Sequence, residues 1–136
     1  MNYFPVMVTK NSSVLKNTIL SLAIGWTFLI LILCLAKFSD LPTIKVSGAD
    51  KYGHFSFHFG FTILWGFYSV LQLGKMQWKK LAYIVLISLG YGVLIEILQE
   101  VFTKTREADL MDIVANFTGA LTAFFSLLLL KKIRND

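Results

Sequence analysis

Four long apolar stretches constrain the fold of this chain of 136 residues more than any other feature. They cover roughly residues 18–36, 53–73, 81–102 and 110–130. A helix needs about 20 mostly apolar residues to cross the hydrocarbon core of a bilayer. Because 56% of the residues are hydrophobic and only 15% are charged, the composition favours a membrane protein over a soluble domain. The sequence therefore predicts an all-α, polytopic membrane protein with a bundle of four transmembrane helices.

Nothing in the sequence divides the chain, which has no internal repeat, low-complexity tract or linker. We therefore expect residues 1–136 to form a single domain. The first apolar stretch is longer than the apolar region of a signal peptide, and no small-x-small cleavage site precedes Lys37, so we interpret it as a retained helix. The one cysteine, Cys34, excludes an intrachain disulfide. We interpret it as a packing or lipid-facing residue.

The basic residues predict how the helices are oriented, because lysine and arginine collect on the cytoplasmic side of a membrane protein. With four spans, eight basic residues fall on one side and five on the other; the eight are Lys10, Lys16, Lys75, Lys79, Lys80, Lys131, Lys132 and Arg134. Both termini are therefore predicted to be cytoplasmic. All acidic residues except Asp136 then lie on the outer side or in the outer half of a helix.

Polar residues from three stretches are expected to meet at the outer face. The second helix begins with an Asp-Lys pair and a histidine, the third ends with Glu-x-x-Gln, and the fourth follows an arginine and begins with spaced aspartates and an asparagine. These candidate site residues are Asp50, Lys51, His54, Glu96, Gln99, Arg106, Asp109, Asp112 and Asn116. Residues three or four positions apart share a helix face, so each segment presents its polar groups along one stripe.

A carboxylate inside a transmembrane helix is unfavourable, by up to about 2.5–3.5 kcal/mol at the helix centre. We therefore predict that Glu96 faces the bundle interior and meets partners there. The cations closest in sequence to these acids are Lys51 and Arg106, and we predict that Arg106 pairs with Asp109, Asp112 or Glu96. The stripe on the fourth helix continues into small residues, which allow another helix to approach closely; these are Ala115, Gly119, Ala120 and Ala123.

Simpler structural roles compete with a binding role at several positions. Asp109, at a helix start, can cap the helix and complement its dipole. Asp112 and Asn116 lie too deep for capping but can form a polar clasp between helices. We interpret His58, which lies among phenylalanines, as a packing histidine. His54 lies at the boundary, where both an interfacial anchor and a site residue are compatible with its position.

In their order along the chain, these residues resemble the pattern of the VanZ-like membrane proteins. That pattern has an Asp-Lys pair and a histidine at the start of one helix, then a Glu-x-x-Gln near the end of a later helix. An arginine, two spaced aspartates, an asparagine and a glycine follow into the last helix. The matching positions are Asp50, Lys51, His54, Glu96, Gln99, Arg106, Asp109, Asp112, Asn116 and Gly119. The resemblance extends over about residues 20–130, and His58 is not part of it.

The resemblance implies a multi-pass protein of the bacterial cytoplasmic membrane, in the cell envelope. The family takes its name from a protein linked to low-level resistance to lipid-tailed glycopeptide antibiotics such as teicoplanin. Because many relatives occur outside any resistance setting, resistance itself is not carried over, and an influence on the response to such antibiotics stays open. The resemblance assigns no biochemical activity and no cofactor.

Our leading hypothesis is a protein that binds a polar lipid head group or a lipid-linked cell-wall precursor. Lys51 and Arg106 would hold an anionic group, Arg106 through its planar fork, and the carboxylates would orient these cations. The expected partner is thus membrane lipid. Nucleic acid is excluded as a partner, because no arginine-rich or aromatic-interleaved soluble patch accompanies the net charge of +5. The sequence does not determine the oligomeric state.

Two other classes of function stay open. In an intramembrane enzyme, Glu96 would act as general base with His54 as its acid partner; in a variant of this idea, His54, Asp109 and Asp112 would hold a divalent metal. No nucleophile motif or phosphate-binding glycine loop supports an enzyme, and we assign no metal ligand from the sequence. The other class is a purely structural membrane protein.

Overall fold

The chain forms four helices, described by a computed structural model for residues 10–36, 48–102 and 108–135. They are α1 (Lys10–Leu35), α2 (Ala49–Leu73), α3 (Trp78–Phe102) and α4 (Leu110–Asn135). The described residues contain no strand, so the predicted all-α class is confirmed. Each predicted stretch corresponds to one helix, and each helix extends past its apolar run into polar residues at one end. The helices continue into these polar residues because helical hydrogen bonds join backbone groups and do not require apolar side chains.

Both ends of α2 are marked by a glycine. Gly48 precedes the helix with φ 80°, and Gly74 follows it with φ 67°. Glycine adopts this left-handed conformation without the steric penalty of a Cβ atom, and it commonly ends helices in this way. Gly74 therefore stops α2 and allows the short connection that leads back into α3.

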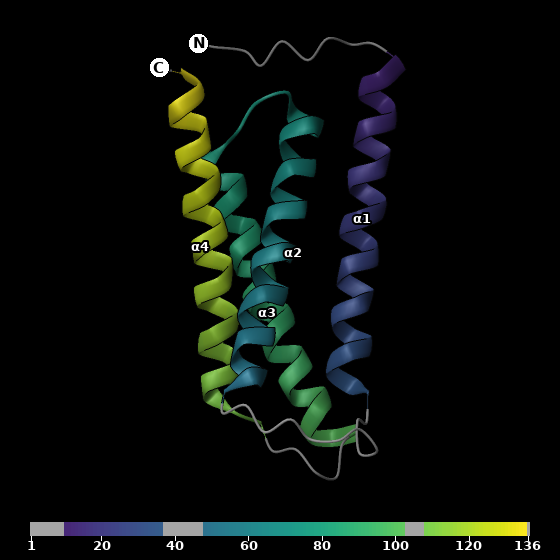
Figure 1. The fold of residues 1–136 in the computed structure, drawn as a ribbon, viewed down its shortest axis with the longest axis vertical. Coiled ribbons are helices and arrows are strands. Elements are labelled where there is room, and N and C mark those ends of the chain that lie inside the picture. Colours follow the sequence, from purple (N-terminus) through teal and green to yellow (C-terminus); the bar gives the residue numbers. More distant parts are fainter. Residues whose placement is uncertain (1–9, 37–47, 103–107, 136) are drawn as a thin grey trace.

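The four helices run up and down in an antiparallel bundle (Figure 1). The first turn of α1 and the last turn of α4 lie at one end of the bundle, where α2 also passes into α3. The opposite end brings together the end of α1, the start of α2, the end of α3 and the start of α4. Helix α2 is central, because it packs against the other three helices and most extensively against α4. Residues distant in sequence are thereby brought to one end.

Three of the helices are long and apolar enough to cross a membrane: Ser12–Leu35, Trp78–Phe102 and Leu110–Ile133. Large apolar side chains such as Phe28, Ile32, Leu86 and Phe125 are exposed on their outer surfaces, as expected of helices that face lipid. Helix α2 is less apolar because it carries polar residues, including two histidines that are buried in the bundle. That α2 is a fourth span stays a prediction.

Small residues allow α2 and α4 to lie close together. A Cβ atom added at Gly119 would collide with the backbone carbonyl oxygen of Phe55 in α2. Ala120 and Ala123 are fully buried on the same stripe. The predicted close approach along this stripe is confirmed, and its partner is α2. Cys34 is buried in the apolar core, which agrees with a packing role.

Hydrogen bonds attach α1 to the rest of the bundle. The indole N–H of Trp26 donates to the carbonyl oxygen of Phe57 at 2.9 Å, and the hydroxyl of Tyr91 donates to the carbonyl oxygen of Thr27 at 2.6 Å. Gly60 leaves room for the Trp26 ring, which a Cβ atom would meet at 2.8 Å. These contacts lie in the middle and toward the end of α1.

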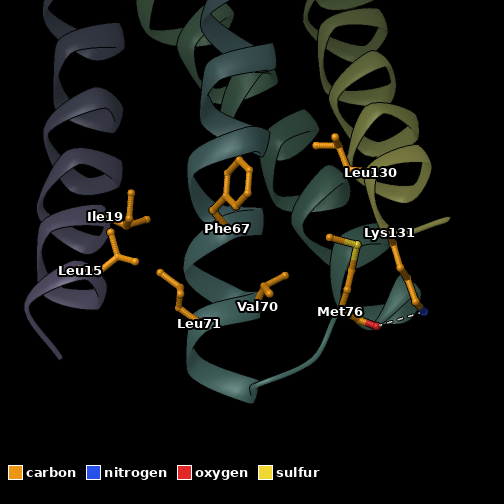
Figure 2. Close-up of a pocket in the computed structure, with 8 residues that line it drawn as sticks. All are labelled: Leu15, Ile19, Phe67, Val70, Leu71, Met76, Leu130 and Lys131. Atoms are coloured by element: carbon orange, nitrogen blue, oxygen red, sulfur yellow. Dashed lines mark hydrogen bonds between the residues drawn. The ribbon is translucent and has the colours of Figure 1, made fainter. Parts of the chain in front are cut away.

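Toward its first turns, α1 leaves an apolar cavity of about 460 Å³ between itself, α2 and α4. Figure 2 shows the side chains around it, from three helices and the connection between α2 and α3. They are Leu15, Ile19, Phe67, Val70, Leu71, Met76, Leu130 and Lys131. At its edge, the Lys131 ammonium donates to the carbonyl oxygen of Met76 at 3.4 Å. This cavity lies at the end of the bundle opposite to the predicted polar residues.

Candidate functional site at one end of the bundle

The first residue of the site, Asp109, starts helix α4. Its carboxylate oxygen Oδ1 accepts the backbone N–H of Met111 at 2.8 Å, and its carbonyl oxygen accepts the N–H of Asp112 at 3.0 Å. This is the geometry of an N-cap residue. The other oxygen, Oδ2, accepts a hydrogen bond from Lys51 at 2.8 Å. Asp109 therefore caps α4 and joins it to α2 at the same time; the capping role is confirmed, and a role in binding stays a prediction.

Among the described residues, Lys51 is the cation that pairs with the aspartates at this end of the bundle. Its ammonium lies 2.8 Å from Asp109, 3.2 Å from Asp112 and 3.5 Å from Asp50. The hydrogen bonds to Asp109 and Asp112 raise the pKa of Lys51 above its usual value of 10.5. The hydrogen bond from Lys51, with that from the Met111 N–H, lowers the pKa of Asp109 below 3.8. Both groups therefore stay charged over a wide pH range.

His54 lies one turn deeper along α2 and contacts α3 and α4. Its Nδ1 is 3.1 Å from Oδ1 of Asn116. An amide oxygen can only accept, so Nδ1 carries the hydrogen, and in the neutral imidazole Nε2 presents its lone pair. This Nε2 lies 3.5 Å from Oδ2 of Asp112 and 3.8 Å from Oε1 of Glu96.

Glu96 enters the same space from α3. Its Oε2 accepts the backbone N–H of Asp109 at 3.3 Å. One ligand-type atom from each of His54, Glu96 and Asp112 lies within 4.8 Å of the other two. The predicted convergence of these residues, from three helices, is confirmed. His54, Glu96, Asp112 and Asn116 are 4%, 2%, 7% and 0% exposed, so the convergence takes place out of contact with solvent.

We use the name polar cluster for these residues together: Asp50, Lys51, His54, Glu96, Asp109, Asp112 and Asn116. It contains four carboxylates and one lysine; Lys51 lies within 4.0 Å of the three aspartates, and His54 lies within 4.0 Å of Glu96 and Asp112. Charges removed from water interact strongly and are unfavourable when they are not balanced. The described part of the cluster is thus acidic overall. Its acid excess favours cations and hydrogen-bond donors as ligands.

The comparison with known families gives a match over most of the chain. A sequence model described as VanZ/LLP1 matches residues 4–131, which is nearly the whole chain. The chain belongs to the VanZ/LLP1 family. No curated protein and no solved structure matches it. The resemblance seen in the sequence is therefore confirmed, and with three apolar helices this VanZ/LLP1 chain is a membrane-type protein.

Two polar residues of the VanZ-like pattern, Gln99 and Arg106, are not among the residues of the polar cluster. The side-chain amide of Gln99 donates to the carbonyl oxygen of Cys34 at 2.8 Å, so Gln99 attaches α3 to the end of α1. Arg106 lies outside the described residues, and its pairing with a carboxylate stays a prediction. His58 is buried and lies 2.8 Å from the hydroxyl of Ser88, in agreement with the packing role expected for it.

Distances in the polar cluster bear on both forms of the enzyme hypothesis for this VanZ/LLP1 protein, the acid–base pair and the metal site. Nε2 of His54 and Oε1 of Glu96 lie 3.8 Å apart, which exceeds a hydrogen bond; that the two act as acid and base on a substrate stays a prediction. The metal variant placed His54 with Asp109 and Asp112. In the structure, Glu96 takes the place of Asp109 beside His54 and Asp112, because Asp109 is held by Lys51.

The sequence reasoning missed the residues of α3 that make room for the cluster. A Cβ atom at Gly92 would lie 2.6 Å from Nδ2 of Asn116 and 3.1 Å from Cε1 of His58. Ser88 is fully buried and contacts His58. The signal was present as Ser88, Gly92 and Glu96 at intervals of four residues, since small residues on one face indicate close helix packing in membranes.

Proposed function

We propose that this VanZ/LLP1 protein is a multi-pass protein of the bacterial cytoplasmic membrane that binds the polar head group of a membrane lipid or of a lipid-linked cell-wall precursor. One observation carries the proposal: ionisable side chains from three helices converge, buried, at one end of an apolar bundle. Polar groups at such a depth are unfavourable and mark binding or transfer sites in membrane proteins. A head group held there would still have its acyl chains in the bilayer beside the helices.

The charge balance supports a ligand rich in hydrogen-bond donors. The ammonium of Lys51 is shared among three aspartates, so within the described residues it is already neutralised. Carboxylates accept hydrogen bonds strongly from hydroxyl and ammonium groups. We therefore propose that the sugar hydroxyls or the amine of a head group contact the carboxylates. A phosphate would rely on Arg106, in line with the anion-binding role expected from the sequence.

In this proposal α2 is the fourth span. Its 25 residues, at about 1.5 Å per residue, exceed the roughly 30 Å of the hydrocarbon core. Its histidines face the interior, where they are bonded to Asn116 and Ser88. With four spans and the excess of basic residues on one side, both termini are cytoplasmic and the polar cluster faces outside. Binding of a cell-wall precursor there would alter the response to lipid-tailed glycopeptide antibiotics.

Native mass spectrometry of gently extracted protein tests the proposal. We expect a co-purifying lipid on the wild type and its loss in Glu96→Gln, which removes a charge in the cluster at almost constant shape. The matched control is Glu100→Gln, since Glu100 lies on the same helix and is exposed. Equal lipid retention by wild type, Glu96→Gln and Glu100→Gln, at equal membrane abundance, would contradict the proposal.

A further inference from the structure

We infer that His54, Glu96 and Asp112 form a binding site for one divalent transition-metal ion. This inference does not depend on the lipid proposal, because it concerns only the side chains of this chain. It starts from the three atoms that face one another: Nε2 of His54, Oε1 of Glu96 and Oδ2 of Asp112. All three residues are buried.

The distances between these three atoms fit ligands of one shared ion better than they fit hydrogen bonds between the side chains. Nε2 of His54 lies 3.5 Å and 3.8 Å from the two carboxylate oxygens, which is too long for hydrogen bonds. Metal–ligand bonds of about 2.0–2.2 Å place neighbouring ligand atoms about 3.0–3.6 Å apart, depending on the coordination angle. The two distances from Nε2 of His54 lie in or near this range, and all three atoms lie within 4.8 Å of one another, so side-chain movements would bring them to coordinating distance.

In each of the three residues, a second polar atom of the side chain accepts or donates a hydrogen bond outside the proposed metal site. Nδ1 of His54 is bonded to Asn116, and Oδ1 of Asp112 accepts from Lys51 at 3.2 Å. Oε2 of Glu96 accepts the backbone N–H of Asp109. Outer hydrogen bonds of this kind fix the tautomer of a ligating histidine and the orientation of ligating carboxylates. The atoms of these residues that face one another are an imidazole nitrogen and two carboxylate oxygens, which are types of atom that bind divalent metal ions.

The ligand set and the charge select the class of ion. One imidazole nitrogen and two carboxylate oxygens suit Zn²⁺, Mn²⁺ or Fe²⁺, whereas Mg²⁺ and Ca²⁺ prefer oxygen alone. Two positive charges would also balance the acid excess of the polar cluster. Three protein ligands leave at least one coordination position for water or for an oxygen of a bound molecule.

Metal titration of the purified, chelator-treated protein in detergent tests the inference. With Co²⁺ as a spectroscopic probe and Zn²⁺ as competitor, we expect one ion per chain. Zn²⁺ should also raise the unfolding temperature of the wild type, since a ligand that binds only the folded state stabilises it. If the wild type binds neither ion and Zn²⁺ does not change its unfolding temperature, the inference is wrong; this result needs no variant to fold.

Variants assign the ligands. Asn116→Ala should weaken metal affinity about 10–100-fold, as expected for an outer partner of a ligating histidine. Glu96→Gln and Asp112→Asn should weaken it more. Glu100→Gln is the matched control and should bind as the wild type does. Asp109→Asn should retain binding, because Asp109 contacts Lys51 and not His54. Wild-type affinity in folded Glu96→Gln and Asp112→Asn would overturn the assignment.

Discussion

The two ends of the bundle are built from the same four helices and held together in different ways. At one end, charged and amide side chains of α2, α3 and α4 bond to one another in the polar cluster. At the other end, α1 and its neighbours leave an apolar cavity lined by residues such as Leu15, Phe67 and Leu130 (Figure 2). Apolar packing is non-directional, whereas the polar cluster requires each partner to keep its position.

The difference predicts where the protein tolerates change. Removing one member of a buried charged group leaves its partners desolvated and unbalanced. Removing a partly exposed apolar group beside the cavity leaves no desolvated charge behind. The polar end should therefore be specific and sensitive to substitution, and the apolar end should be adaptable.

The largest effect is expected from Asp112→Ala. The change removes the partner of both Lys51 and His54 at a buried position, so we expect it to lower the free energy of unfolding by about 3–5 kcal/mol. Leu130→Ala, at the cavity on the same helix and 48% exposed, should have an effect below about 1 kcal/mol. Reversible unfolding in mixed detergent measures both. Equal losses of unfolding free energy in the two variants would contradict the proposed difference between the polar and apolar ends of the bundle.

The next effect concerns the approach of α2 to α4 beside the polar cluster. Gly119→Ala would place its methyl group against the backbone of Phe55, which cannot move independently of its helix. We expect a loss of about 1–3 kcal/mol from overpacking. Gly90→Ala is the control, because a Cβ atom there meets nothing within 4 Å; it should be neutral or stabilise by up to about 1 kcal/mol. Thermal unfolding of both variants would reveal whether the helix contact is as close as we describe.

The smallest effect is expected from pH, because Lys51 and Asp109 lie at the partly exposed edge of the polar cluster. The pKa of Asp109 is lowered, so its contribution to stability is present above 3.8 and is lost as pH falls through the lowered value. The pKa of Lys51 is raised, so its contribution is present below 10.5 and is lost as pH rises through the raised value. We expect the contribution of these two groups to the unfolding temperature to be constant between about pH 4 and 10 and to be lost outside this window. Lys51→Met should weaken the pH dependence of the unfolding temperature at both acid and alkaline pH.

The sequence predicted the helices well, because an apolar run of about twenty residues that crosses a membrane must satisfy its backbone hydrogen bonds internally, which a helix does. It also predicted that His54, Glu96 and Asp112 meet, since a polar group at that depth must face the interior. The sequence did not predict that the Gln99 side chain contacts Cys34 in α1. Gln99 lies on the same helix face as Glu96, and from this face its side chain can contact α1 as well as the polar cluster. Nor did the sequence predict how Lys51 is divided among its acids. That division depends on distances of a few ångströms, which helical periodicity does not specify.

The most direct test of a binding site, as opposed to a structural clasp, is a joint measurement on Asp112→Asn of its abundance in the membrane and of the lipid that co-purifies with it. Asparagine keeps the size of aspartate and most of its hydrogen-bonding capacity but removes the charge. We predict wild-type abundance and loss of the bound lipid. Loss of abundance with normal lipid retention by the remaining protein would contradict this prediction and make the polar cluster a scaffold.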